Sequence, residues 1–366
     1  MSASAGSDSS SAPPAPAALP GSSAPGTGRL RLVTSMFVLV VLAVGVLFPL
    51  AENSRQGTMS IAVFALIFMV AVTAWNIFSG YSGYLALGHA VFFGVGAYTI
   101  ALIAQDWHVP AGWAIMALLP VCGVVAGLVA IPVGLVALRT RRHTFVVVTI
   151  AVFFIFQTLA TNLAFTGGTG GVQLPFVSWT FSVYNERFYY VALVILVATV
   201  ALSWAVRRSR FGLQLMAIRD DEDRARGMGV RTGRVKLAAF VLSAIPVGMV
   251  GGLWAYFLGS VYPQSAFDPL FDIALALMGF FGGIGTIAGP LVGALLLESL
   301  QQYFTETFSA NGLYLIIYGG LFLVVILLMP RGIVPSVSHW LRSWRAQRVD
   351  RAAKPAAGSD TAGVTG

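Results

Sequence analysis

Long apolar segments follow one another along most of the chain, separated by short polar stretches. An α-helix needs about 20 apolar residues to cross the hydrocarbon core of a membrane. The pattern predicts an all-α, polytopic membrane protein with about ten transmembrane helices, at residues 33–50, 58–78, 84–104, 112–138, 144–165, 188–206, 236–259, 270–284, 288–304 and 312–330. The eighth and ninth segments are short, so a re-entrant hairpin over 270–304 is the alternative to two full spans.

The composition supports this prediction. Hydrophobic residues make up 57% of the chain and charged residues 10%, and the mean hydropathy is +0.82. Soluble globular domains carry about 25% charged residues, so lipid is the expected solvent for most of the surface. The single cysteine, Cys122, excludes an internal disulfide framework and a cysteine-based metal site.

Basic residues predict the orientation of the spans. With ten spans, 20 of the 22 Lys and Arg residues fall on one side, which the positive-inside rule makes cytoplasmic together with both termini. The net charge of +8 therefore indicates a membrane topology rather than a nucleic-acid partner. We expect a disordered cytoplasmic tail at 1–30, a transmembrane domain at 31–335 with its largest cytoplasmic loop at 207–236, and a basic, then disordered cytoplasmic tail at 336–366.

The loop at 207–236 contains 13 charged residues in 30 positions. An acidic block over 220–223 precedes Arg224 and Arg226, an order that suits a short helix over 217–229, ended by Gly227 and Gly229. A solvated orientation signal would explain the basic residues. The mixed charge signs and the interleaved Leu213 and Met228 favour a surface that docks on another protein.

Motifs for chemistry are absent from the sequence. No G-x-x-x-x-G-K-[ST] motif occurs, so no Walker A nucleotide site is expected. The four histidines are scattered without a second metal ligand at helix spacing, and no nucleophile–base pair is recognisable. We therefore expect no catalytic residues, no metal site and no cofactor in this chain, and an intramembrane enzyme is disfavoured.

Two glycine-rich segments interrupt the apolar texture, at 76–98 and 279–296. Interrupted helices expose backbone groups that can bind a polar solute, and a pair of them in two halves of a chain marks a transport pathway. Together with a polar position on the fifth span, they supply the candidate pathway residues Ser82, Gly83, Gly88, His89, Thr149, Gly283 and Gly285. The alternatives are close helix packing for the glycines, an interior hydrogen bond for His89, and a bond to its own helix for Thr149.

Five stretches resemble the permease subunits of branched-chain amino acid (Liv-type) ABC importers. They are GYSGYLALGHAVFFGVGAY, RRHTFVVVTIAVFFIFQ, FTGGTGGV, SRFGLQLMAIRDDEDRARGMGVRTGRVKLAAFVLSA and FFGGIGTIAGPLVGALLLE. The wording ALGHAVFFGVGAY is similar to the M-type subunit rather than its H-type sister. The resemblance extends over about residues 33–335 and implies the larger, type II-like class of permease fold.

The resemblance implies a cytoplasmic coupling helix that sits in a groove of an ATPase subunit. The family motif E-A-A-x-x-x-G is matched by Ala225 and Gly229, while Asp223 is a shortened acid and Arg224 departs from the small residue. Glu222 lies one position earlier and leaves the register open by one residue. The expected ATPase-coupling residues are Arg219, Glu222, Asp223, Arg224, Ala225 and Gly229.

The resemblance also implies the partners. These are a second, H-type permease subunit, two ABC ATPase subunits that bind ATP and Mg, an extracellular or periplasmic substrate-binding protein, and the lipid of the plasma (inner) membrane. The implied substrates are branched-chain amino acids, with urea, short amides and aromatic acids as alternatives within the family. A stand-alone secondary transporter is the alternative of another class, and the shortage of intramembrane carboxylates, with Glu298 the clearest, argues against it.

Overall fold

The computed structural model describes residues 56–308, 319–320, 323, 332–334 and 336. All of them belong to the second of two units, residues 49–366. The predicted span at 33–50 and most of the span at 312–330 lie outside the described residues, as do the tail at 1–30 and most of the tail at 336–366.

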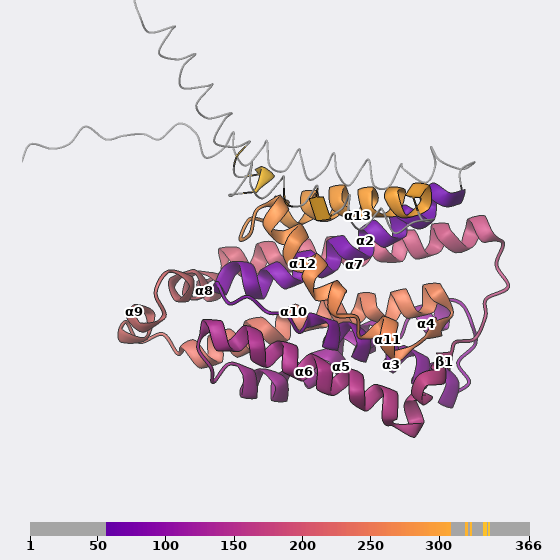
Figure 1. Cartoon of the computed structure of the whole chain (residues 1–366), viewed down its shortest axis with the longest axis horizontal. Helices are drawn as coiled ribbons and strands as arrows, with labels where there is room; N and C mark the ends of the chain where they lie inside the picture. Colours follow the sequence, from indigo (N-terminus) through magenta and orange to yellow (C-terminus); the bar gives the residue numbers. More distant parts are fainter. Residues whose placement is uncertain (1–55, 309–318, 321–322, 324–331, 335, 337–366) are drawn as a thin grey trace, which may run out of the picture. The chain divides into compact units, whose positions relative to one another are not determined.

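Helices make up nearly all of the described part (Figure 1). The longer ones are α2 (Gln56–Trp75), α3 (His89–Asp106), α5 (Leu119–Ala137), α6 (Arg142–Asn162), α7 (Phe181–Arg208), α8 (Arg210–Asp220), α10 (Thr232–Leu258), α12 (Pro269–Gly282) and α13 (Ala288–Phe308). The shorter ones are the π-helix η1 (Asn76–Gly80), α4 (Trp113–Met116), the 3-10 helices η2 (Ala164–Thr166) and η3 (Gly168–Gly170), α9 (Glu222–Gly227) and α11 (Pro263–Ala266).

Six segments among the described residues are long and apolar enough to cross a membrane. They are Met59–Gly80, Trp113–Ala137, Arg142–Asn162, Val183–Arg208, Thr232–Leu258 and Pro263–Gly282, and each overlaps one predicted span. Helices α3 and α13 occupy two further predicted positions but are not among the six. The structure therefore supports a polytopic membrane protein without establishing the count of ten.

Helix α10 lies at the centre of the described bundle and packs most extensively on α3 and α5. Its backbone approaches α3 so closely that a Cβ atom on Gly96 would lie 2.0 Å from the carbonyl oxygen of Gly248. Small residues allow this approach, which maximises van der Waals contact where lipid gives no hydrophobic driving force. The glycine pattern of the first half of the chain thus serves helix packing at this position.

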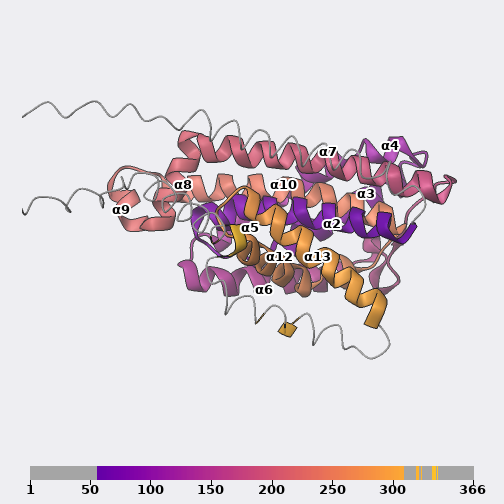
Figure 2. The same ribbon diagram turned by 90° about the horizontal axis from the view of Figure 1, so that it is seen from above.

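Helices α8 and α9 project at one end of this bundle in both views, and we call it the loop end (Figures 1 and 2). The strand β1 (Val172–Gln173) lies at the other end in Figure 1. It pairs antiparallel with β2 (Ser260–Val261), next to the glycine loop at 166–172. Gly167, Gly168 and Gly171 have positive φ angles there, as the tight-loop prediction requires.

Candidate functional site

The polar loop between α7 and α10 folds as two helices, where the sequence predicted a single one over 217–229. Asp221 separates α8 from α9 with extended backbone, and its carboxylate accepts hydrogen bonds from the amides of Asp223 and Arg224 at 3.0 Å. An Asp at this position is a strong N-cap and begins a new helix. Gly229, with a φ angle of +87°, follows the end of α9 and turns the chain toward α10.

One carboxylate attaches α9 to the bundle. The Nζ atom of Lys236, on α10, lies 2.7 Å from Oε1 of Glu222, and the hydroxyl of Tyr84 donates to Oε2 of the same residue. Lys236 also donates to the Tyr84 hydroxyl at 3.1 Å. The Lys236 side chain is only 4% exposed, so its ammonium group needs these partners in place of water.

The electrostatics of Glu222 follow from this arrangement. Burial raises the pKa of the Glu222 carboxyl, but the hydrogen bonds from Lys236 and Tyr84 and the charge of Lys236 outweigh it, so the pKa lies below its ordinary value. The carboxylate is therefore ionised at neutral pH and holds α9 through a charge-assisted contact.

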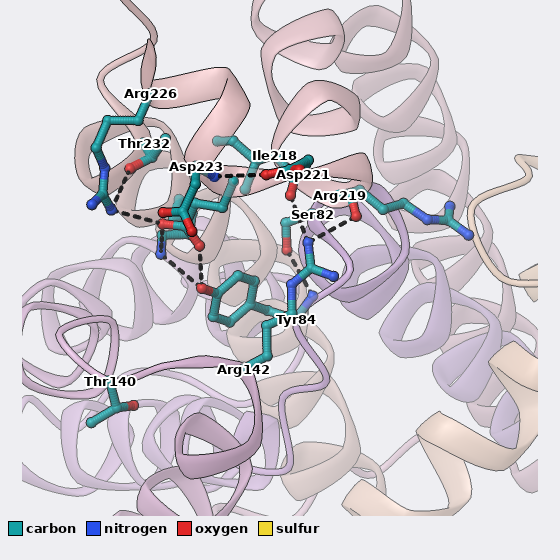
Figure 3. Close-up of polar contacts among 12 residues, drawn as sticks. Ser82, Tyr84, Thr140, Arg142, Ile218, Arg219, Asp221, Asp223, Arg226 and Thr232 are labelled. Atoms are coloured by element: carbon teal, nitrogen blue, oxygen red, sulfur yellow. Dashed lines mark hydrogen bonds and ion pairs between the residues drawn. The ribbon is translucent and has the colours of Figure 1, made fainter.

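Arg142, at the start of α6, fixes the other end of the same junction. Its Nη2 atom donates to the carbonyl oxygens of Ile218 at 2.6 Å and Arg219 at 2.8 Å, in the last turn of α8. A cation at a helix C-terminus satisfies free carbonyls and favours the helix dipole. The guanidinium also lies over the Tyr84 ring, 5.7 Å from its centroid (Figure 3).

Arg219 reaches from α8 into the bundle. Its Nη1 atom donates to the carbonyl oxygen of Gly80, at the end of η1, at 2.8 Å. A Cβ atom on Gly83 would lie 2.9 Å from the Cγ of Arg219, and a Cβ on Gly285 would lie 2.2 Å from its Nη1. The two glycines, with φ angles of +72° and +78°, therefore leave room for the arginine side chain.

The two interrupted segments of the sequence lie against each other at this point. We call residues 76–88 the first break; they comprise η1, the helical residues 81–82 and the non-helical stretch 83–88. Residues 283–287, between α12 and α13, are the second break. The Asn76 side chain donates to the carbonyl oxygen of Thr286 and accepts from the amide of Gly285, both at 2.8 Å. Asn76 is fully buried, so this amide replaces water for both backbone groups.

Most of the predicted pathway residues are buried, and Gly83 and Gly285 are half-buried. His89 is fully buried and bonds Ser243 at 3.0 Å, so it is an interior hydrogen-bonding residue here. Thr149 donates to its own helix at Val146, as the alternative expected, and also accepts from the amide of Leu87 at 3.2 Å.

The remaining pathway positions divide between the two breaks. The Ser82 hydroxyl accepts from the amide of Tyr84 at 3.3 Å, and a Cβ on Gly88 would lie 3.1 Å from Thr149. Gly83 and Gly285 contact Arg219, while Gly283, at the end of α12, has a φ angle of +119°. A cavity of about 470 Å³ lies elsewhere, near the end opposite α9, and is lined by Ala104, Gln105, His108, Val109, Gln173, Leu174 and Pro175.

The expected coupling residues face two ways. Glu222 contacts the bundle and Ala225 is fully buried, while Arg219 is exposed but reaches the Gly80 carbonyl with its guanidinium. Asp223, Arg224 and Gly229 are exposed. The exposed side of the loop also carries Leu213 and Met228, which are 62% and 74% exposed. An apolar and charged surface of this kind fits a docked protein partner.

Four contact residues escaped the sequence reasoning: Asn76, Tyr84, Arg142 and Lys236. Asn76 and Lys236 had a usable signal, because a polar side chain within or at the edge of an apolar span is costly and needs a partner. Tyr84 and Arg142 had none, because both are ordinary residues at the ends of membrane helices.

Comparison with known proteins decides the family. The family described as "Branched-chain amino acid transport system / permease component" matches residues 57–326. The chain belongs to this permease family.

Relatives of the permease agree with this assignment. The chain is 28% identical to the high-affinity branched-chain amino acid transport system permease protein LivM of Escherichia coli K12, over 84% of this chain and 76% of LivM. It is 30% identical to LivH of the same organism over 39% of this chain and 45% of LivH. The autoinducer 2 import system permease protein LsrC of Yersinia pseudotuberculosis is 24% identical over 69% of this chain and 78% of LsrC. No solved structure matches the chain significantly.

Proposed function

We propose that this permease is the M-type subunit of an ABC importer for branched-chain amino acids in the plasma (inner) membrane. The family match over residues 57–326 and the LivM likeness across 84% of the chain carry the proposal. The subunit forms the translocation pathway with a second permease of the H type, and the likeness to LivH supports a partner built on related lines. It binds no nucleotide and performs no chemistry itself.

Two ATPase subunits drive this pathway from the cytoplasm, and a substrate-binding protein delivers the amino acid from outside. Helix α9 is the coupling helix in this proposal. It is exposed along Asp223 and Arg224 and joined to α10 and the first break through Glu222. A helix with one free face and one charge-paired face can receive a partner and pass its movement to the membrane spans.

The substrate is the most specific part of the proposal, and the likeness to LsrC gives a reason to test a different substrate. LsrC is named as an autoinducer 2 import permease, and its likeness extends over 69% of this chain. An importer for another small polar solute, including urea, short amides or aromatic acids, is therefore the second candidate. The substrate-binding protein that works with the permease distinguishes these candidates, because selectivity begins there.

The test is transport by a reconstituted complex. The permease is purified with a second permease, two ATPases and a binding protein encoded beside it, and placed in vesicles. ATP-dependent uptake of labelled leucine, isoleucine or valine supports the proposal. ATP-dependent uptake of another solute would keep the importer assignment and change only the assigned substrate. Uptake driven by a proton or sodium gradient, without ATPases, would instead identify a secondary transporter.

A further inference from the structure

Arg219 occupies a position where three separate segments meet. It belongs to the last turn of α8, two residues before Asp221 begins α9. Its side chain donates to the Gly80 carbonyl of the first break and fills the space next to Gly285 of the second. Figure 3 shows this side chain pointing away from Tyr84 and Arg142, so it makes a contact apart from the Glu222 network.

The base of this arginine is rigid. Arg142 holds the carbonyl oxygens of Ile218 and Arg219, and Asp221 caps α9 directly afterwards. When α9 and the end of α8 move as a unit, the backbone of Arg219 therefore moves with them. Its guanidinium, a planar group with five donors, carries that movement to the two breaks.

The two breaks also contact each other directly. Asn76 bonds Gly285 and Thr286, and a Cβ on Gly80 would lie 3.0 Å from the Gly285 amide. Non-helical backbone inside a membrane protein is stable only where it is enclosed by protein or lines a water-filled path. Here the first break is mostly buried, the second is half-buried beyond the buried Gly283, and the exposed Arg219 lies between them and the loop end.

We propose that Arg219 is a positioning residue that clamps the two breaks together and releases them when α9 is displaced. This inference rests on the proposed function, since it assigns the transmission of ATPase movement to one side chain. The clamp keeps the breaks packed against each other at the loop end. Displacement of α8 and α9 withdraws the guanidinium and frees the Gly80 carbonyl and the backbone of the second break.

The test uses the complete reconstituted transporter with Arg219→Ala, Arg219→Lys and the control Arg234→Ala. Arg234 lies at the start of α10, is exposed, and is not one of the expected coupling residues. A hydrogen bond from a charged donor shifts an equilibrium about tenfold or more. We expect Arg219→Ala to lower uptake per ATP hydrolysed about tenfold, Arg219→Lys to restore part of it, and Arg234→Ala to leave it unchanged.

Hydrogen exchange gives a second readout that does not depend on transport. Arg219→Ala is expected to speed amide exchange in peptides covering 76–88 and 283–287, while exchange in 222–227 stays as in the wild type. Unchanged exchange in both breaks would overturn the clamp. Faster exchange with normal uptake per ATP would overturn its role in transmission.

Glycine variants test the same contact from the other side. Gly285→Ala places a methyl group 2.2 Å from the Arg219 Nη1 atom and 3.1 Å from the Gly80 carbonyl oxygen, whereas Gly259→Ala has an equivalent φ angle, +73° against +78°, with nothing within 4 Å. Both variants carry the same backbone strain, so only Gly285→Ala should reproduce the Arg219→Ala exchange pattern. The Arg219→Ala, Gly285→Ala double variant should exchange no faster than Arg219→Ala alone, and additive effects would contradict the clamp.

These readouts separate the two proposals. If the wild-type complex shows no ATP-dependent uptake of any solute, the proposed function fails. The exchange pattern of the same variants still decides whether Arg219 holds the two breaks together.

Discussion

The contact between Glu222 and Lys236 gives a quantitative prediction for stability. Their charged atoms lie 2.7 Å apart, with side-chain exposures of 17% for Glu222 and 4% for Lys236. Removing one partner of a buried pair costs about 3–5 kcal/mol, because the other charge stays buried. Glu222 keeps some access to water, so we expect Glu222→Gln to lower the free energy of unfolding by about 3 kcal/mol, at the low end of that range.

An internal comparison isolates this effect. The ion pair between Arg224 and Asp221 has a similar length, 3.0 Å, but its side chains are 85% and 41% exposed. Exposed pairs contribute about 0–1 kcal/mol, so Arg224→Ala should change stability by less than about 1 kcal/mol. The Glu222→Gln, Lys236→Met double variant should recover part of the Glu222→Gln loss, because no charge then remains buried.

The assay is SDS titration of the purified transporter in mixed micelles, followed by tryptophan fluorescence. Equal losses for Glu222→Gln and Arg224→Ala would refute the reasoning, since burial would then have no influence. The reasoning would also be refuted if the double variant lost more free energy of unfolding than the sum of the losses in Glu222→Gln and Lys236→Met.

Two further predictions follow from the same structure. Because the pKa of Glu222 is lowered in the folded protein, its contribution to stability is complete above the ordinary carboxyl pKa of 4.5 and is lost as the pH falls through the lower, folded value. The free energy of unfolding, measured from pH 7 to 3, should therefore fall at acid pH in the wild type by an amount that Glu222→Gln does not show. Gly96→Ala should destabilise α3 against α10 by about 2 kcal/mol or more, because the new Cβ meets the Gly248 carbonyl at 2.0 Å. Gly233→Ala, in the first turn of α10 with nothing within 4 Å, should not destabilise the protein, because Ala favours a helix over Gly.

The sequence predicts the helices of this protein better than their boundaries. Apolar length alone predicts the six segments that the structure supports as spans, because a helix is the ordinary way to satisfy backbone groups in lipid. It does not find the start of α3, which the span at 84–104 places too early. The helix begins at His89, where the Asp272 carboxylate accepts from the Ala90 amide at 3.1 Å. That contact spans 182 residues of sequence and leaves no local pattern.

The candidate site divides in the same way. The charged loop and both glycine-rich segments are visible in the sequence, and the structure places them at one junction. The identity of the joining residue is not visible, because Arg219 and Gly80 lie 139 positions apart. The sequence also left open whether Glu222 or Asp223 matches the acidic position of the family motif. The two side chains point in different directions from α9: Glu222 faces Lys236, while Asp223 is exposed.

We propose that ATP hydrolysis by a partner subunit reaches the membrane spans through α9. The most direct measurement is the number of substrate molecules imported per ATP in a complex that carries the Asp223→Arg, Arg224→Asp exchange. This exchange alters the exposed face of α9 and leaves the Glu222 contact in place. The account predicts continued hydrolysis with uptake largely lost, whereas an unchanged ratio of uptake to hydrolysis would contradict it.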